Sequence, residues 1–376
     1  MSLHQNKLFF FGKVILLSTS VLLFAAALLA FPKEAAAGVS NGISYCLNLL
    51  VPSLFPFMAL STFVASSGLA EFLGRPFAPL MRFLFRLPPC ASPVLFMGMA
   101  GGYPVGARGI ASLRKEGKLT DDQAARMLYF CVNAGPAFTI STVGAALFGG
   151  LSYGLLLFLS QASASLLIGI ALRFSSHSSF SEPSRSASGL RPQALTSAVS
   201  SASKGMFQMC AFVVLFSVLT ELLRSSGILA FLCRSLLFLG VPHPSAAVLP
   251  SMILEITGGC RDAALLGSSI PAVAFGLGWG GLCVHFQVLA AAGDIPIRRT
   301  LFFLFRLVHG LLSAAIASTL LPWSPKSEQV FFGSSVPVAA QPSGSAAAAA
   351  ALVMLCGAFL LVVGKDTGKL RKNMLQ

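Results

Sequence analysis

Long apolar stretches separated by short polar connections dominate the chain. A helix needs about 20 residues to cross a hydrocarbon core of about 30 Å. The apolar residues run continuously instead of alternating, which favours helices over the strands of a membrane barrel. The pattern therefore predicts an all-α polytopic membrane protein, a single membrane domain over residues 1–376 with about eight transmembrane helices. The expected helices are 8–31, 43–67, 127–149, 151–172, 206–224, 268–292, 301–321 and 349–364.

Two further apolar stretches, 90–107 and 244–266, carry glycine and proline near their centres. Inside a helix, glycine costs about 1 kcal/mol and proline about 3 kcal/mol relative to alanine. At the tip of a hairpin these costs mostly vanish, so we expect re-entrant hairpins with tips at Gly101–Gly102 and Gly258–Gly259. A glycine-rich packing face between helices is the alternative. Residues 72–87 and 228–240 are amphipathic and are expected at the membrane interface.

Composition supports the membrane class, with 55% hydrophobic and only 10% charged residues, against about 25% charged in soluble domains. The net charge of +14 does not indicate nucleic-acid binding, because lysine and arginine occur in short clusters between apolar runs. That arrangement is typical of cytoplasmic loops. The eight cysteines are single and form no Cys-x-x-Cys pair, so we interpret them as packing residues.

The basic clusters also predict an orientation. With a cytoplasmic N-terminus, Arg75–Arg86 and Arg108–Arg126 both fall on the cytoplasmic side, so 90–107 has to enter and leave on that side. The Ser-rich residues 173–205 are then a cytoplasmic linker and the low-complexity residues 325–348 an extracytoplasmic loop. The C-terminus ends in the cytoplasm. The first apolar run also resembles a signal peptide, but its length favours an uncleaved helix.

The two halves of the chain resemble each other. "SSGLAEFL" at 66–73 matches "SSGILAFL" at 225–232, and each match is followed by a proline-bearing turn, a glycine pair and a long helix. We therefore predict two repeats, 43–150 with hairpin 90–107 and 206–292 with hairpin 244–266. The charge topology makes them inverted. Inverted repeats with broken helices are typical of secondary transporters.

The residues around both predicted tips are the candidate solute-binding residues. The N-termini of half-helices carry a partial positive charge that suits an anion. An acid within an apolar stretch, Glu255, is a candidate for a coupling proton or cation, and Arg261 for a solute carboxylate. The predicted set is Gly101, Gly102, Tyr103, Pro104, Gly106, Arg108, Asn133, Glu255, Gly258, Gly259, Arg261, His285 and Gln287.

Structural roles compete for several of these residues. Glu255 and Arg261, or Arg261 and Asp262, could form an ion pair that closes the second hairpin. Arg108 could be an ordinary cytoplasmic charge. Asn133, His285 and Gln287 could hydrogen-bond neighbouring helices instead of a solute.

The sequence contains none of the motifs that would indicate an enzyme. There is no Walker A motif and no His-Glu-x-x-His. "GLGWGG" at 276–281 formally matches a dinucleotide-binding motif but lies inside an apolar run, where no strand and helix surround it. We expect no catalytic residues, no metal and no cofactor. Transport energy would come from an ion gradient or from the solute's own gradient.

Four motifs together resemble one family, the YlbJ-type sporulation integral membrane proteins of the nucleoside-recognition, or Gate, superfamily, also named stage V sporulation protein V. They are "GGYPVGARG", "FCVNAGPAFTISTVG", "LEITGG" and "GGLCVHFQV", spread over about residues 40–320. The resemblance implies a multi-pass protein in the outer forespore membrane. It implies transport of dipicolinic acid toward the spore core and a role in cortex formation. It also implies likeness to concentrative nucleoside transporters.

The resemblance carries Gly102, Tyr103, Pro104, Gly106 and Ala107 over as the first tip. We expect helix N-termini with Arg261 and Arg108 to balance the carboxylates of dipicolinate, and Tyr103 to stack on its ring. Two other functions stay open: a nucleoside transporter, for which Asn133, Gln287 and Glu255 would suit ribose hydroxyls, and a membrane scaffold for spore assembly that moves no solute. The sequence leaves the coupling ion and the oligomeric state open.

Overall fold

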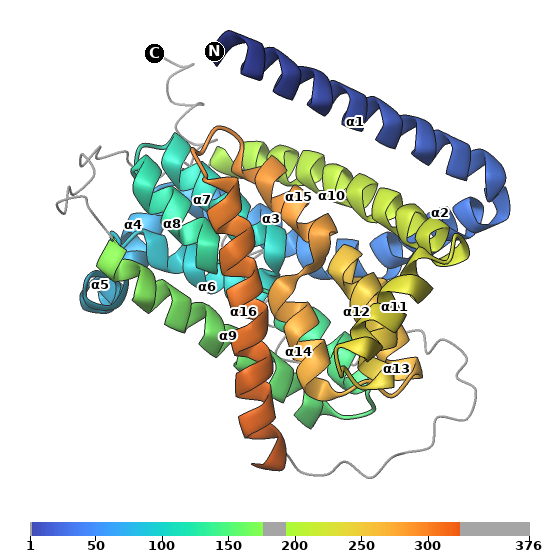
Figure 1. The fold of residues 1–376 in the computed structure, drawn as a ribbon. Coiled ribbons are helices and arrows are strands. Elements are labelled where there is room, and N and C mark those ends of the chain that lie inside the picture. The colour runs from blue at the N-terminus through green and yellow to red at the C-terminus, as the bar shows by residue number, and fades with distance from the viewer. Residues whose placement is uncertain (1, 176–192, 324–376) are drawn as a thin grey trace, which may run out of the picture.

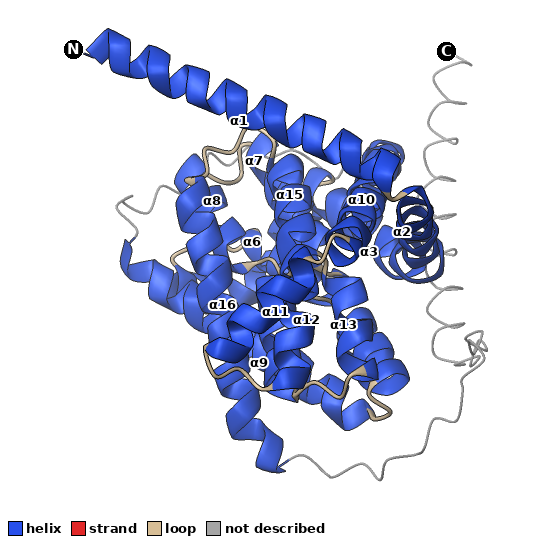
Figure 2. Cartoon of the chain, turned by 45° about the vertical axis from the view of Figure 1, so that its right-hand side comes forward, coloured by secondary structure: helices blue, strands red, loops and turns tan. Residues whose placement is uncertain are grey.

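The computed structural model describes residues 2–175 and 193–323, and every regular element among them is a helix (Figures 1 and 2). The first part contains α1 (Ser2–Ala30), α2 (Pro32–Tyr45), η1 (Cys46–Leu50), α3 (Val51–Ser66), α4 (Leu69–Gly74), η2 (Arg75–Phe77), α5 (Ala78–Leu80), η3 (Met81–Phe85), α6 (Ala91–Gly101), α7 (Tyr103–Lys115), α8 (Asp121–Phe130), η4 (Ala137–Leu147), α9 (Leu151–Leu172) and η5 (Arg173–Ser175). The second part contains α10 (Ala194–Ser225), α11 (Ile228–Phe238), α12 (His243–Leu254), α13 (Ile256–Leu265), α14 (Ile270–Trp279), α15 (Gly281–Ala292), α16 (Arg299–Leu320) and η6 (Leu321–Trp323).

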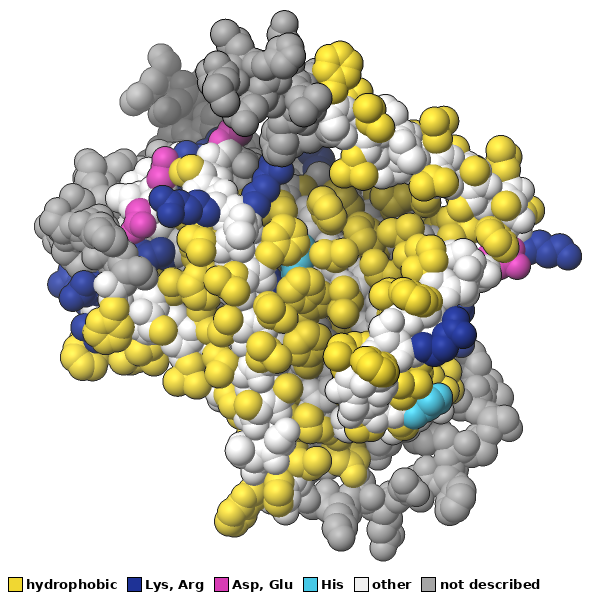
Figure 3. All heavy atoms as spheres, viewed as in Figure 1, with side chains coloured by type: hydrophobic (Ala, Val, Ile, Leu, Met, Phe, Trp, Pro, Cys, Tyr) yellow, Lys and Arg dark blue, Asp and Glu magenta, His cyan; other side chains and the backbone are white. Residues whose placement is uncertain are grey.

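Helical segments long and apolar enough to cross a membrane number five among the described residues: 32–66, 151–172, 194–225, 270–292 and 299–323. Apolar side chains cover the middle of the face in Figure 3, and most of the charged side chains visible there lie toward its margins. The chain is thus an all-α integral membrane protein with several apolar helices, as predicted. The apolar run 14–30 ends α1 and is shorter than these five. The expected helix 349–364 and loop 325–348 lie outside the described residues.

One part of the predicted Ser-rich linker is helical. Of residues 173–205, the stretch from Ala194 onward already belongs to α10, and Ala198 and Ala202 are fully buried. The prediction of a flexible linker was wrong there, because small alanine and serine side chains also permit close helix packing. Residues 176–192 are outside the described part.

Helix α10 packs closely along α2 and the start of η1. A Cβ added to Gly38 would lie 2.6 Å from the Cα of Val218, and one added to Gly42 would lie 2.7 Å from the Cα of Val214. One turn further on, the Cys46 thiol contacts the Cys210 carbonyl oxygen at 3.7 Å. The i, i+4 spacing of these three positions therefore makes a continuous antiparallel seam.

Each of the two predicted hairpin regions folds into two helices that turn back on each other. Helices α6 and α7 meet at Gly102 (φ +98°). Gly98 and Gly106 face each other across the pair, since a Cβ on Gly98 would lie 3.0 Å from the Cα of Gly106. The second helix of this hairpin, α7, continues to Lys115 instead of ending at residue 107, where the predicted hairpin ended.

The second pair turns three positions earlier than its glycines suggest. Helices α12 and α13 meet at Glu255, which has an extended backbone, whereas Gly258 and Gly259 lie inside α13. A Cβ on Gly259 would lie 2.7 Å from the Cα of Met252. The predicted tip at Gly258–Gly259 was therefore wrong, because Gly259 serves the close approach of the two limbs and not the turn.

Two of the predicted continuous helices are broken. The stretch 127–149 is unwound over 131–135, after α8, and resumes as the π-helix η4. The stretch 268–292 is interrupted between α14 and α15, where Gly280 and Gly281 both have positive φ. Pro136 lacks an N–H and the two glycines adopt left-handed backbone conformations, so both breaks follow from local sequence that the apolar pattern concealed.

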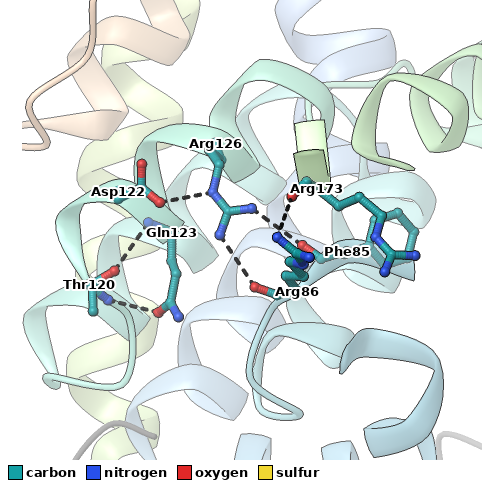
Figure 4. A network of polar contacts seen from close by, with 7 residues as sticks. All are labelled: Phe85, Arg86, Thr120, Asp122, Gln123, Arg126 and Arg173. Atoms are coloured by element: carbon teal, nitrogen blue, oxygen red, sulfur yellow. Dashed lines mark hydrogen bonds and ion pairs between the residues drawn. The ribbon is translucent and has the colours of Figure 1, made fainter. Parts of the chain in front are cut away.

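The predicted interfacial stretches form short helices. Residues 72–85 fall within α4, η2, α5 and η3, and residues 228–238 form α11. Figure 4 shows how the first group is attached: Arg126 donates to Asp122 (3.0 Å) and to the carbonyls of Phe85 and Arg86, and Arg86 donates to the carbonyl of Arg173. Arg86, Arg126 and Arg173, which the distribution of basic residues predicts on the cytoplasmic side, thus lie together.

Gly106 gives a direct test of the first hairpin. An added Cβ there would collide with the carbonyl oxygen of Cys131, so we expect Gly106→Ala to lower the apparent melting temperature of the detergent-solubilised protein by about 5 °C or more. Thermal stability by size-exclusion chromatography after heating measures this. Gly12→Ala, at a position with nothing within 4 Å, is the matched control. Equal stability of both variants would contradict the close approach.

Candidate functional site

One cavity lies where the two hairpin tips and the two helix breaks come together. Its volume is about 40 Å³. Most of its lining is apolar, with a few polar groups, as is usual for small-molecule sites. The lining residues are Leu50, Ser53, Leu54, Gly102, Tyr103, Pro104, Ala134, Gly135, Phe138, Met209, Val213, Glu255, Ile256, Thr257, Cys283, Val284 and Gln287.

Each helix break touches one tip. Gly135, in the unwound stretch after α8, lies against the first tip, and its added Cβ would be 3.0 Å from the amide nitrogen of Gly102. Gly281, at the start of α15, lies against the second tip, and its added Cβ would be 3.1 Å from the carbonyl oxygen of Leu254. The irregular backbone of four separate segments is therefore concentrated around one space.

The first tip presents the N-terminus of α7 to the cavity. Gly102 adopts a conformation open only to glycine, and Pro104 occupies the first turn of the helix, where a missing N–H costs nothing. Tyr103 is almost fully buried, and its hydroxyl donates a 2.6 Å hydrogen bond to the carbonyl of Leu277 in α14. The tyrosine therefore ties the first hairpin to the second broken helix while it lines the cavity.

At the second tip, the side chain of Glu255 caps the helix that follows it. The carboxylate of Glu255 accepts hydrogen bonds from the amides of Thr257 (2.7 Å) and Gly258 (2.6 Å), which caps the N-terminus of α13. Glu255 is 4% exposed and lines the cavity. Among the described residues, Glu255 forms no ion pair with Arg261 or with any other base, so the alternative of a Glu255–Arg261 ion pair was wrong.

Arg306 of α16 joins the two helix breaks, a role that the sequence analysis missed. Its guanidinium is fully buried and donates to the carbonyls of Val132 (2.5 Å) in the first break and of Trp279 (3.2 Å) and Gly278 in the second. Unpaired carbonyls are costly in a water-free interior, and the five N–H donors of arginine can serve several at once. The signal was present in the sequence, as a charge inside the apolar stretch 301–321.

Gln161 and His309 complete the support of the first break. The Gln161 side chain of α9 accepts from the Ala134 amide (3.0 Å) and donates to the Ala134 carbonyl (2.7 Å). His309 contacts the Gln161 carbonyl through Nε2 (2.8 Å) and Arg306 through Nδ1 (2.9 Å). Both side chains are fully buried. They replace the hydrogen bonds that an unbroken helix would have made.

Two predicted binding residues have this supporting role instead of lining the cavity. His285 of α15 contacts the Trp279 carbonyl through Nε2 (2.8 Å) and packs edge-on against Trp279 and Phe302. Asn133 donates to the Ser165 hydroxyl (3.2 Å) across to α9. For both, the alternative of hydrogen bonds between helices describes the observed contacts.

The structure brings five predicted residues to the cavity and leaves the rest outside its lining. Gly102, Tyr103, Pro104, Glu255 and Gln287 line it, and Gln287 makes one weak contact to the Cys283 sulfur (3.2 Å). Gly101, Gly106, Gly258 and Gly259 lie within the two hairpins, next to the cavity. Arg108 and Arg261 are not part of the lining and contact other helices. No lysine or arginine is among the lining residues.

We expect Arg306→Leu to destabilise the protein strongly, because it leaves buried carbonyls of two helix breaks without donors. Loss of one partner from a buried charged network costs about 3–5 kcal/mol, or on the order of 10 °C in apparent melting temperature. Arg299→Leu, at the exposed start of the same helix, is the control. If heating and size-exclusion chromatography find the two variants alike, Arg306 does not hold the breaks.

Comparison with known proteins agrees with the motifs. Residues 48–176, which contain the first hairpin and the first broken helix, match the family model described as Gate, nucleoside recognition. The chain is 28% identical over 341 residues to the sporulation integral membrane protein YlbJ of Bacillus subtilis (strain 168), covering 83% of each chain. No solved structure gives a significant match. This chain is therefore similar, over most of its length, to a YlbJ-type sporulation integral membrane protein, and its residues 48–176 match the Gate model.

Proposed function

We propose that this protein is a secondary transporter that binds a small solute in the cavity between its two hairpin tips. The observation that carries the proposal is the meeting of four interrupted helices at one space lined by Glu255 and Gln287. Irregular backbone at membrane depth survives only where protein buries it or a wet path solvates it. A non-transporting scaffold has no need of such a costly arrangement.

The same proposal interprets the hairpins as re-entrant and the two halves as an inverted repeat, like that of concentrative nucleoside transporters. Each half has one hairpin followed by one broken helix: α6–α7 before α8–η4, and α12–α13 before α14–α15. The second helix of each hairpin also has a closely packed glycine at the fourth residue after the tip: Gly106 in α7 and Gly259 in α13. These parallels support the repeat.

Dipicolinate is the first solute proposed, transported across the outer forespore membrane during spore maturation and cortex formation. The similarity to a sporulation membrane protein supports it, and so does the N-terminus of α7 at the cavity, which favours a carboxylate. Glu255 would repel a dianion. A proton or cation taken up at Glu255 would remove that repulsion, so we expect flux to be coupled to such an ion.

A nucleoside is the second candidate, because one observation favours it. The polar side chains of the lining are a carboxylate, an amide and hydroxyls, from Glu255, Gln287, Ser53 and Thr257. These groups suit the hydroxyls of ribose, and the matching family model carries the description nucleoside recognition. Uridine is therefore the comparison solute in the test.

The test is uptake of labelled dipicolinate or uridine into proteoliposomes that contain the purified protein. We expect dipicolinate uptake, lowered about tenfold by Gln287→Ala, a loss of about 1.4 kcal/mol of binding. Glu255→Gln should leave uptake insensitive to an imposed proton gradient. Asp294→Asn, an exposed acid far along the chain from both tips, is the control variant.

Each outcome decides among the functions. Uptake of uridine alone would replace dipicolinate by a nucleoside. Uptake that Gln287→Ala and Glu255→Gln leave unchanged would place the solute elsewhere. No uptake of either solute, by protein that remains monodisperse, would favour the scaffold function.

A further inference from the structure

Two arginines outside the cavity occupy equivalent places in the two hairpins. Arg108 is the sixth residue after the break at Gly102, and Arg261 is the sixth residue after the break at Glu255. In both limbs a glycine at the fourth residue, Gly106 or Gly259, packs on the opposite limb. The arginine two residues further on is therefore carried at a similar distance from the cavity in each hairpin.

The first arginine connects α7 to α10. Arg108 donates a hydrogen bond to the Ser201 carbonyl (3.3 Å), and its guanidinium lies directly on Gly205, where any Cβ would collide with it. Its Nε is buried and has no hydrogen-bond partner among the described residues. The side chain therefore fills the space between the two helices while one of its donors stays unused.

The second arginine belongs to a contact between α13 and the α2–α10 pair. Arg261 lies near the Tyr45 hydroxyl at the end of α2. Its neighbour Asp262 pairs with Arg224 near the end of α10 (2.7 Å), and Arg224 also lies 3.5 Å from Glu221. The Asp262–Arg224 ion pair thus holds this limb to α10.

The two contacts lie on opposite sides of the cavity along α10. Ser201 and Gly205 come first on this helix, the cavity-lining Met209 and Val213 follow, and Arg224 is last. Gly205 and Arg224 are about 28 Å apart at 1.5 Å per residue. Figure 1 shows α10 running from the end that holds α7 and α8 to the end that holds α11–α13.

We propose that the Arg108 contact with α10 and the Asp262–Arg224 ion pair are two gates that close the cavity from opposite sides. Each holds the second limb of one hairpin against the fixed α2–α10 pair, and each must release before a solute passes on its side. A carboxylate that reaches either guanidinium competes with its present partner, so arrival of a small anion favours opening. The proposal rests on the transport function proposed above.

Cys283 is a built-in reporter for these gates, because it lines the cavity and is only 1% exposed. The experiment labels the otherwise native protein with a membrane-impermeant maleimide, in right-side-out and in inside-out vesicles, and quantifies the Cys283 peptide by mass spectrometry. We expect Arg108→Gln to raise labelling from the side of the α7 loop, and Asp262→Asn from the other side. The rise should be up to about fivefold, the range of a partly exposed polar contact.

The controls are Lys115→Gln, exposed on the same helix as Arg108, and Asp294→Asn. Gly205→Ala is a second variant of the Arg108 gate, because an added Cβ displaces the Arg108 guanidinium without removing its charge. It should change labelling in the same way as Arg108→Gln. Unchanged labelling in all gate variants, or increases from one side only, would overturn the gates. If wild-type uptake is normal in that case, the transport function stands. Sided labelling without uptake would keep the gates and reject the proposed solutes.

Discussion

The arrangement depends on one constraint: backbone groups freed by a broken helix need partners where water is scarce. Two hairpin tips and two helix breaks meet here, and side chains of neighbouring helices satisfy backbone groups at both breaks. Arg306 serves the carbonyls of Val132, Gly278 and Trp279, while Gln161 takes both polar groups of Ala134. Removing these side chains would expose carbonyls at a cost of several kcal/mol. The cavity can exist because side chains of neighbouring helices supply hydrogen-bond partners for these backbone groups.

The same constraint explains why the cavity has an acid and no base in its lining. The N-terminus of α13 has free amides, and Glu255 satisfies two of them. The bases that the sequence places near the tips are six residues further along each limb, about 9 Å away at helical rise, and contact α10 and α2 instead. Charge is thus separated by position, since an acid lines the cavity and the two arginines lie further along the hairpins.

Much of the site was predictable from the chain alone, and the errors have physical causes. Gly102 and Pro104 were identified because glycine and proline are costly within a helix, and Glu255 because an ionisable residue in an apolar stretch is costly. Gly258–Gly259 was misplaced as a tip, since glycine serves close packing as well as turns. Arg306 was overlooked within an apolar helix, and the breaks in 127–149 and 268–292 were concealed by continuous hydrophobicity.

By itself the sequence determined the class of protein, the helical architecture and the interruption at the first hairpin tip, because hydrophobicity, glycine and proline act locally. Only the tertiary structure decided which interrupted segments meet, and therefore which polar residues face a common space. Gln287 and Glu255 share the cavity, whereas His285, two residues from Gln287, supports a break. That difference depends on helix rotation and on contacts between residues far apart in the chain, which no local pattern encodes.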